Sequence, residues 1–164
     1  MSRQTILITG IALIVLPLVA LGLKLFSFGW LMVMLMFGPV FVMIIGYVLQ
    51  IVIATQGFLV RRDLFGSALR RATLASWISL IGIVLLGIFV PDGGDSGYGS
   101  TFQVWLGAYG ENGDAVHAST DALGDVVTFI AMAAWIVGFV WLVAEWIAAL
   151  VRRNRARKAG VTAG

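Results

Sequence analysis

The chain has 164 residues, of which 60% are hydrophobic and 12% are charged, with a formal net charge of +3. Its mean hydropathy is +1.01, and soluble domains carry about twice this share of charged residues, so a water-soluble fold of this size is excluded. The absence of cysteine excludes disulfides, thiolate catalysis and cysteine-ligated metal centres. The composition therefore predicts an integral membrane protein.

The first apolar run, residues 6–23, is just long enough to cross the hydrocarbon core of a bilayer as a helix. We interpret it as the first transmembrane helix. A cleaved signal peptide over residues 1–22 is the competing interpretation, because Arg3 precedes the run and Ala20 and Gly22 resemble a small-residue cleavage site. Against cleavage, the run is long for a signal peptide and Arg3 is the only charge before it.

The second apolar run, residues 31–60, follows a short turn that is rich in aromatic side chains. A straight helix over this run would be about 45 Å long, which exceeds the hydrocarbon core. Gly38 and Pro39 interrupt the run, and a proline removes one backbone donor and clashes with the preceding turn. We expect a second transmembrane helix that bends at this dipeptide.

A basic hinge, residues 61–71, separates the second run from the third, residues 72–90. The hinge holds four arginines, and short loops rich in Lys and Arg mark the cytoplasmic side of a membrane. Residues 91–125 have the opposite character, with frequent glycine, six acidic residues and no Lys or Arg. We therefore expect the hinge in the cytoplasm and residues 91–125 as one long external loop.

The fourth apolar run, residues 126–151, ends in a basic cytoplasmic tail, residues 152–164. Four membrane crossings place ten of the 11 Lys and Arg residues on one side and only Lys24 on the other. The sequence thus predicts an all-α integral membrane protein, a single domain over residues 1–164 with four transmembrane helices in a bundle. We expect both termini in the cytoplasm and the protein in a bacterial plasma membrane.

Small and polar residues recur on one face of each of the last three helices, at the spacing that allows helices in lipid to pack closely. They are Gly46, Gln50, Ala54 and Gly57 in the second helix, Ala72, Ser76, Ser79 and Gly82 in the third, and Ala131, Ala134 and Gly138 in the fourth. We expect these faces to form the interior.

Gln50 and Glu145 are the candidate functional residues, because polar groups inside apolar runs are costly and often functional. Arg152 follows Glu145 by two helical turns, or about 10 Å, which places the carboxylate near the cytoplasmic end of its helix. We expect water, Arg152 or an arginine of the hinge that begins at Arg61 to stabilise this charge, and Gln56 to donate a hydrogen bond to it. A structural role is favoured over proton or cation coupling.

Two further features lie in the external loop. Trp105 and Tyr109 belong to an apolar stretch that we expect to contact the membrane surface, the helices or a partner. His117 has acidic neighbours at helical spacing, an arrangement that can bind a divalent cation but that also suits a solvated helix start. These neighbours are Asp114, Asp121 and Asp125. We favour the solvated helix start and assign no metal site.

No catalytic or cofactor-binding motif is present, and a single histidine excludes bis-histidine haem ligation within the chain. We expect a non-enzymatic accessory, assembly or regulatory subunit of a larger membrane complex. The alternative is a small homo-oligomeric transporter or channel that uses Gln50 and Glu145 as polar groups of its pathway. The expected partners are the lipid bilayer and either another membrane protein or further copies of this chain. Nucleic acid is not expected, because the basic residues flank apolar runs.

Overall fold

The computed structural model describes residues 1–27, 29–60, 63–94 and 97–161. Arg61 and Arg62 of the hinge, Asp95 of the acidic loop and residues 162–164 of the tail lie outside the described residues. The expectation of an almost entirely helical chain with four apolar helices of membrane-spanning length is confirmed within the described part. The four segments are Arg3–Ser27, Pro39–Leu59, Gly66–Phe89 and Gly113–Lys158.

The first helix, α1, spans Arg3–Lys24 and is followed by a short 3-10 turn, η1, at Leu25–Ser27. The hydroxyl of Ser2 caps its N-terminus by accepting a hydrogen bond from the backbone of Thr5 at 3.2 Å. The helix therefore starts before the apolar run, because the polar cap and not hydropathy sets its first residue.

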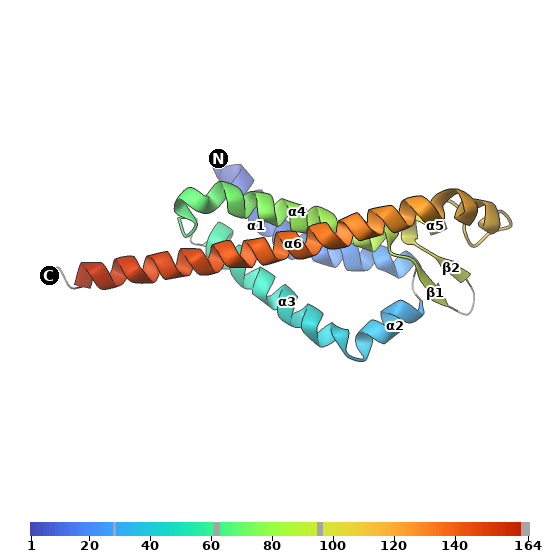
Figure 1. Cartoon of the computed structure of the whole chain (residues 1–164), viewed down its shortest axis with the longest axis horizontal. Helices are drawn as coiled ribbons and strands as arrows, with labels where there is room; N and C mark the ends of the chain where they lie inside the picture. Colours follow the sequence, from blue (N-terminus) through green and yellow to red (C-terminus); the bar gives the residue numbers. More distant parts are fainter. Residues whose placement is uncertain (28, 61–62, 95–96, 162–164) are drawn as a thin grey trace.

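The second apolar run does not form one bent helix. It is divided into α2 (Trp30–Met36), α3 (Pro39–Ala54) and a π-helical turn, η2 (Thr55–Leu59). Gly38 is extended, with φ −169°, and Pro39 starts α3 at a position where its missing N–H costs no hydrogen bond. The Gly38-Pro39 dipeptide thus breaks the helix instead of bending it, and α2 and α3 form a V in Figure 1.

Helix α4 (Leu69–Phe89) follows a 3-10 turn, η3 (Gly66–Ala68), and packs along α6 (Gly113–Val161). The small-residue faces expected from the sequence meet at this contact. A Cβ atom on Gly138 would lie 2.5 Å from the backbone nitrogen of Ser79, and one on Gly82 would lie 2.7 Å from the carbonyl oxygen of Ala131. The two backbones approach so closely only because both glycines lack a side chain.

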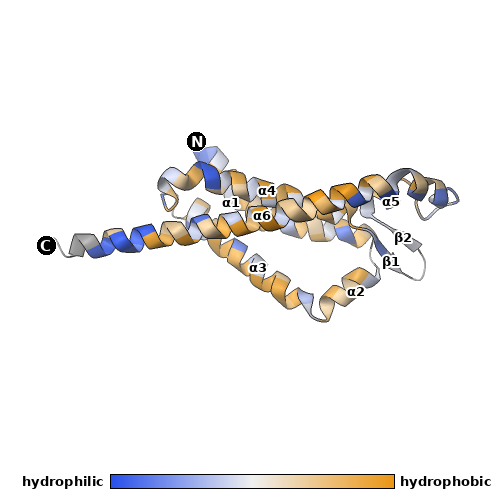
Figure 2. Ribbon diagram, in the orientation of Figure 1, coloured by the Kyte–Doolittle hydropathy of each residue, from blue (hydrophilic) through white to orange (hydrophobic). Residues whose placement is uncertain are grey.

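Helix α1 packs on α4, so α4 is the central helix of a three-helix core that α1 and α6 complete. A Cβ on Gly87 of α4 would lie 2.5 Å from the carbonyl oxygen of Ala20 in α1. Helix α3 contacts α1 near the C-terminal end of α3 and then diverges from the core, as Figure 1 shows. Apolar residues run along the middle of all these helices in Figure 2, and polar residues gather towards their ends.

The region expected as an external loop is largely ordered. It contains an antiparallel hairpin of β1 (Asp92–Gly94) and β2 (Gly97–Gly99), a short helix α5 (Thr101–Trp105), and the first turns of α6. Helix α6 begins at Gly113, well before the apolar run at residue 126, because a helix satisfies its own backbone in water as well as in lipid. Hydropathy predicts where a helix enters the membrane and does not predict where it starts.

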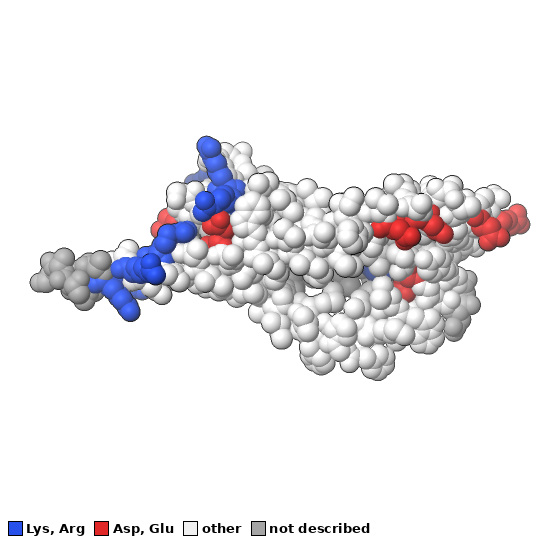
Figure 3. All heavy atoms as spheres, viewed as in Figure 1, with Lys and Arg blue, Asp and Glu red and all other residues white. Residues whose placement is uncertain are grey.

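Charge divides the molecule along its length. Figure 3 shows most Lys and Arg at the end where both termini lie in Figure 1, and acidic residues concentrated at the opposite end. We call these the basic end and the acidic end. Asp63 and Glu145 are the acidic residues of the basic end among the described residues, and Lys24 is a basic residue near the acidic end.

Candidate functional site

Gln50 is buried between α3 and α1, where its side chain repairs a defect in the α1 backbone. Pro17 lies inside α1 and has no N–H, so the carbonyl of Leu13, one turn earlier, lacks its usual helical donor. The Nε2 atom of Gln50 donates a hydrogen bond to this carbonyl at 2.8 Å. Tyr47 donates similarly to the carbonyl of Ile14 at 2.8 Å. Both polar side chains of α3 thus hold it to the part of α1 that precedes Pro17.

Glu145 forms an ion pair with Arg71 across the contact between α6 and α4. The Nε atom of Arg71 donates to one carboxylate oxygen at 2.7 Å, and an Nη atom donates to the other at 3.3 Å. The indole of Trp141 adds a weaker hydrogen bond at 3.4 Å. The Glu145 side chain is 11% exposed and the Arg71 side chain is 61% exposed, so Arg71 extends from the protein surface to reach a buried partner.

Of the partners expected for Glu145, the hinge supplies the one in direct contact, through Arg71. Gln56 does not donate to Glu145 within the described residues; its Oε1 atom accepts a hydrogen bond from the indole of Trp146 at 3.3 Å. Arg152 interacts with Glu145 electrostatically, while Arg71 makes the direct contact. The sequence places arginines at the start of α4, at the same end of the molecule as Glu145. The relative rotation of α4 and α6 decides which arginine contacts the carboxylate.

At the acidic end, Lys24 is buried and forms part of a polar network that joins α1 to the end of α4 and to α5. Its ammonium donates to the carbonyl of Val90 at 2.7 Å and to the hydroxyl of Ser27 at 2.9 Å. Thr101 donates to the carbonyl of Leu23 at 2.9 Å and lies 3.1 Å from the Ser27 hydroxyl. Lys24 therefore closes the acidic end of the core instead of facing water.

Asp92, the first residue of β1, caps the N-terminus of α2, although the two lie about 60 residues apart in the sequence. Its carboxylate accepts hydrogen bonds from the backbone nitrogens of Gly29 at 3.0 Å, Leu31 at 2.8 Å and Met32 at 3.2 Å. Neither Gly29 nor its neighbours in α2 supplies a side-chain cap, and a carboxylate at a helix N-terminus is favoured by the helix dipole. The hairpin thus fixes where α2 begins.

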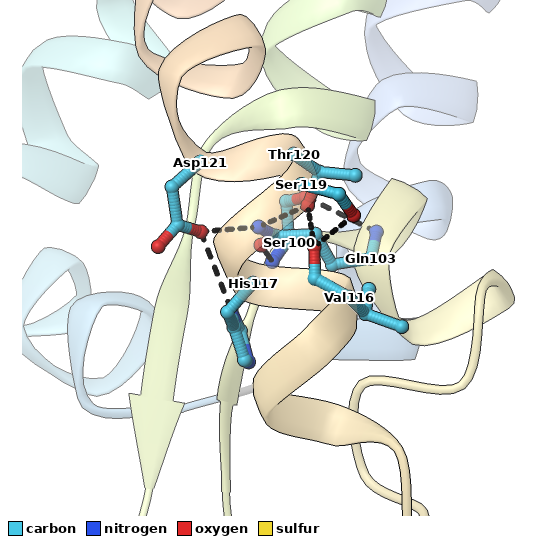
Figure 4. Close-up of polar contacts among 7 residues, drawn as sticks. All are labelled: Ser100, Gln103, Val116, His117, Ser119, Thr120 and Asp121. Atoms are coloured by element: carbon cyan, nitrogen blue, oxygen red, sulfur yellow. Dashed lines mark hydrogen bonds and ion pairs between the residues drawn. The ribbon is translucent and has the colours of Figure 1, made fainter.

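Gln103 joins α5 to α6 in the cluster drawn in Figure 4. It completes a capping box with Ser100, and its Nε2 atom donates to the carboxylate of Asp121 at 2.7 Å and to the hydroxyl of Thr120 at 3.0 Å. Asp121 also lies 3.3 Å from Nδ1 of His117. The same carboxylate oxygen serves both contacts, which ties the α5 segment to the start of α6.

The acidic neighbours of His117 do not converge on it. Asp121 is in contact, and among the described residues no group of three or more His, Asp or Glu side chains is placed to hold a metal ion. The ring of Tyr98 lies on that of His117, with 5.5 Å between centroids. Burial raises the pKa of the Tyr98 phenol, and the carboxylates of Asp121 and Asp125 raise it further, so the phenol stays neutral beside them.

Trp105 and Tyr109, expected as contact residues, remain about half exposed within the chain itself. The ring of Trp105 meets that of Phe26 edge to face at 6.1 Å, and the ring of Tyr109 covers Gly97 of the hairpin. Their outer faces are available to lipid or to a partner. The interactions that sequence reasoning missed are that of Gln50 with the carbonyl freed by Pro17 and that of Asp92 with the start of α2.

Each missed pair had a weak sequence signal. Pro17 stands inside the first apolar run, and a proline there always frees a carbonyl one turn earlier. Asp92 follows Pro91 directly after the third run, and Asp is among the residues that most often cap helix N-termini. The identity of the partner was not readable in either case. No protein-family model, no curated protein and no solved structure matches this chain.

Proposed function

We propose that this chain is a non-enzymatic accessory, assembly or regulatory subunit of a larger membrane complex, and that α2 and α3 contact its partner. The observation that carries the proposal is the divergence of α3 from the three-helix core. Apolar side chains on these two helices are largely exposed, with Met34 of α2 at 66% and Val42 and Ile45 of α3 at 72% and 70%. A transmembrane helix of a partner can pack against α3 by close contact in lipid.

The hydrogen bonds of the two buried polar side chains also support an accessory subunit over a transporter. Gln50 and Glu145, the groups that a pathway would need, make hydrogen bonds within the chain to the Leu13 carbonyl and to Arg71. A group that conducts protons or ions must exchange partners, whereas these two join one helix to another. We therefore retain the small homo-oligomeric transporter or channel as the alternative that the experiment must exclude.

We further propose that the basic end faces the cytoplasm of a bacterial cell, with both termini inside and the hairpin, α5 and the start of α6 outside. The positive-inside rule supports this orientation, because Lys and Arg concentrate at one end of four apolar helices. The lipid bilayer is then the general partner and a membrane protein the specific one.

Site-specific photo-crosslinking in living cells tests the proposal. A photoreactive amino acid at Val42 or Ile45 of α3 should capture a second membrane protein of defined size. The matched control is the same amino acid at Phe129 or Val137, which are equally exposed and apolar but lie on α6 of the core. These control positions should give lipid adducts or weak, scattered products.

The outcomes separate the two functions. One discrete heterologous product from α3 supports the accessory subunit, while a product with twice the mass of the chain supports the homo-oligomeric alternative. If α3 and α6 positions behave alike, the divergence of α3 has no role in partner contact and the proposal fails. Trp105→Ala then asks whether the acidic end contributes: a weaker complex with normal insertion indicates a second contact at α5.

A further inference from the structure

A pocket of about 390 Å³ lies at the basic end, between the loop that precedes α4 and the part of α6 from Ala149 to Arg153. Its lining residues include Asp63, Phe65, Ser67, Ala149, Arg152 and Arg153. The loop is firmly held on its inner side, since Leu64 and Phe65 are buried and the ring of Phe65 packs on that of Phe58 with 5.2 Å between centroids. The pocket is therefore a built feature of the fold.

The pocket combines apolar and cationic walls. Ala149 belongs to the apolar run of α6 and is 1% exposed, whereas Arg152 and Arg153 begin the basic part of that helix and are exposed. Two arginines and one aspartate give the described lining a net positive charge. The transition from apolar to basic occurs within one turn of α6, which is where a helix passes from hydrocarbon to headgroups.

We infer that this pocket binds the phosphate group of an anionic phospholipid, with Arg152 and Arg153 as the cationic contacts. Arginine pairs with phosphate through two parallel hydrogen bonds, and Ser67, which also lines the pocket, has a hydroxyl that can serve as a further donor. Basic pockets beside transmembrane helices at the cytoplasmic surface suit such headgroups. A lipid phosphate in this pocket would link α6 to the loop before α4 at the basic end.

The position of the pocket favours a lipid over a free phosphate compound. A soluble ion would gain from the arginines alone, whereas a phospholipid also lays its acyl chains along the exposed apolar residues of α6, such as Ile147 and Val151. The Asp63 carboxylate at the rim opposes any anion, so its removal should strengthen binding of either ligand.

Lipid titration of the purified full chain in neutral detergent tests the inference. Native mass spectrometry counts bound lipid, and the thermal transition reports its effect on stability, with dioleoyl phosphatidylglycerol compared against dioleoyl phosphatidylcholine. Inorganic phosphate and glycerol phosphate form the soluble arm. We expect phosphatidylglycerol to bind and to raise the transition temperature, and the zwitterionic lipid and soluble phosphates to do neither.

Two pairs of variants that lose the same positive charge test whether the lipid binds in the pocket or elsewhere on the basic end. Arg152→Gln combined with Arg153→Gln should weaken phosphatidylglycerol binding by about tenfold or more. The matched control, Arg155→Gln combined with Arg157→Gln, removes the same charge from the same helix outside the pocket and should cost less than about threefold. Because Arg152 also acts on Glu145, Ser67→Phe provides a pocket-filling variant with no change of charge, and it too should abolish the stabilisation.

Asp63→Asn should act in the opposite direction and tighten binding. Equal losses in the pocket pair and the control pair would mean general attraction to a charged surface and would overturn the inference. Unchanged binding in Ser67→Phe would overturn it as well. If inorganic phosphate stabilises the protein as strongly as the lipid does, and Arg152→Gln with Arg153→Gln removes this effect, a soluble phosphate ligand replaces the lipid.

Discussion

Gln50 compensates for Pro17. The proline leaves the Leu13 carbonyl of α1 without its helical donor, and the Gln50 amide supplies one from α3 at 2.8 Å. The interaction explains a polar residue inside an apolar run without any reference to transport. It also attaches α3 to the core in the region where the two helices still touch.

Gln50→Leu should destabilise the protein by about 1 kcal/mol, because the carbonyl of Leu13 is left buried without a partner. In a Pro17→Ala background the same substitution should cost close to nothing, since alanine in place of the proline would bring the N–H that the helix lacks. A double-mutant cycle of unfolding in a denaturing detergent measures the difference. Additive effects of the two changes would contradict the compensation.

Gly138→Ala should destabilise the contact between α4 and α6 by about 1–3 kcal/mol. The added methyl group meets the backbone of Ser79 and Ala75, which cannot move aside as a flexible side chain would. Gly46→Ala in α3 is the control, because nothing lies within 4 Å of its added methyl group, and it should be neutral or slightly stabilising. Thermal unfolding of both variants in the same detergent provides the comparison.

Glu145→Gln should lower stability by only about 0.5–1 kcal/mol, because the partner guanidinium of Arg71 is well exposed and the amide keeps one hydrogen bond. Insertion and assembly should be preserved. Arg71→Gln and the double variant complete a cycle in which the two single effects should not add. A variant that assembles normally but loses a deletion-complementing activity or a proteoliposome flux would indicate that Glu145 titrates in function.

Asp92→Ala should release the start of α2. The three backbone N–H groups at the start of α2 lose their acceptor, at a cost of about 2–3 kcal/mol, and Asp92→Asn should retain part of the capping. Hydrogen exchange at the amides of Leu31 and Met32 measures the release directly. Asp114→Ala, an exposed acidic residue in the first turn of α6, is the control and should leave these amides protected.

Reporter fusions test the orientation. Reporters after Arg71 and at the C-terminus should read cytoplasmic, and one inserted at Gly94 in the hairpin should read external, because Lys and Arg concentrate at the first two sites. A C-terminal reporter that reads external would invert the arrangement. Removing several arginines of the hinge and tail together should be needed to reverse it.

The sequence by itself determined the membrane class, the four apolar helices and the separation of charge along the molecule. These properties depend on the transfer of each segment from water to hydrocarbon, which is a sum over neighbouring residues and can be read locally. The small-residue faces of α4 and α6 were also readable, because helical periodicity places Ser79 and Gly138 on definite sides of their helices.

Only the tertiary structure decided which polar groups meet. Arg71, not Arg152, reaches Glu145, and Gln50 meets the carbonyl freed by Pro17, because the relative rotation and height of packed helices select the partners. The separation of α2 from α3 has the same origin: Gly38-Pro39 permits either a bend or a break, and the Asp92 carboxylate stabilises a separate α2 by capping its start. Hydropathy carries no information about the rotation and height of one helix relative to another, or about a cap supplied by a distant residue. These features depend on contacts between segments distant in sequence.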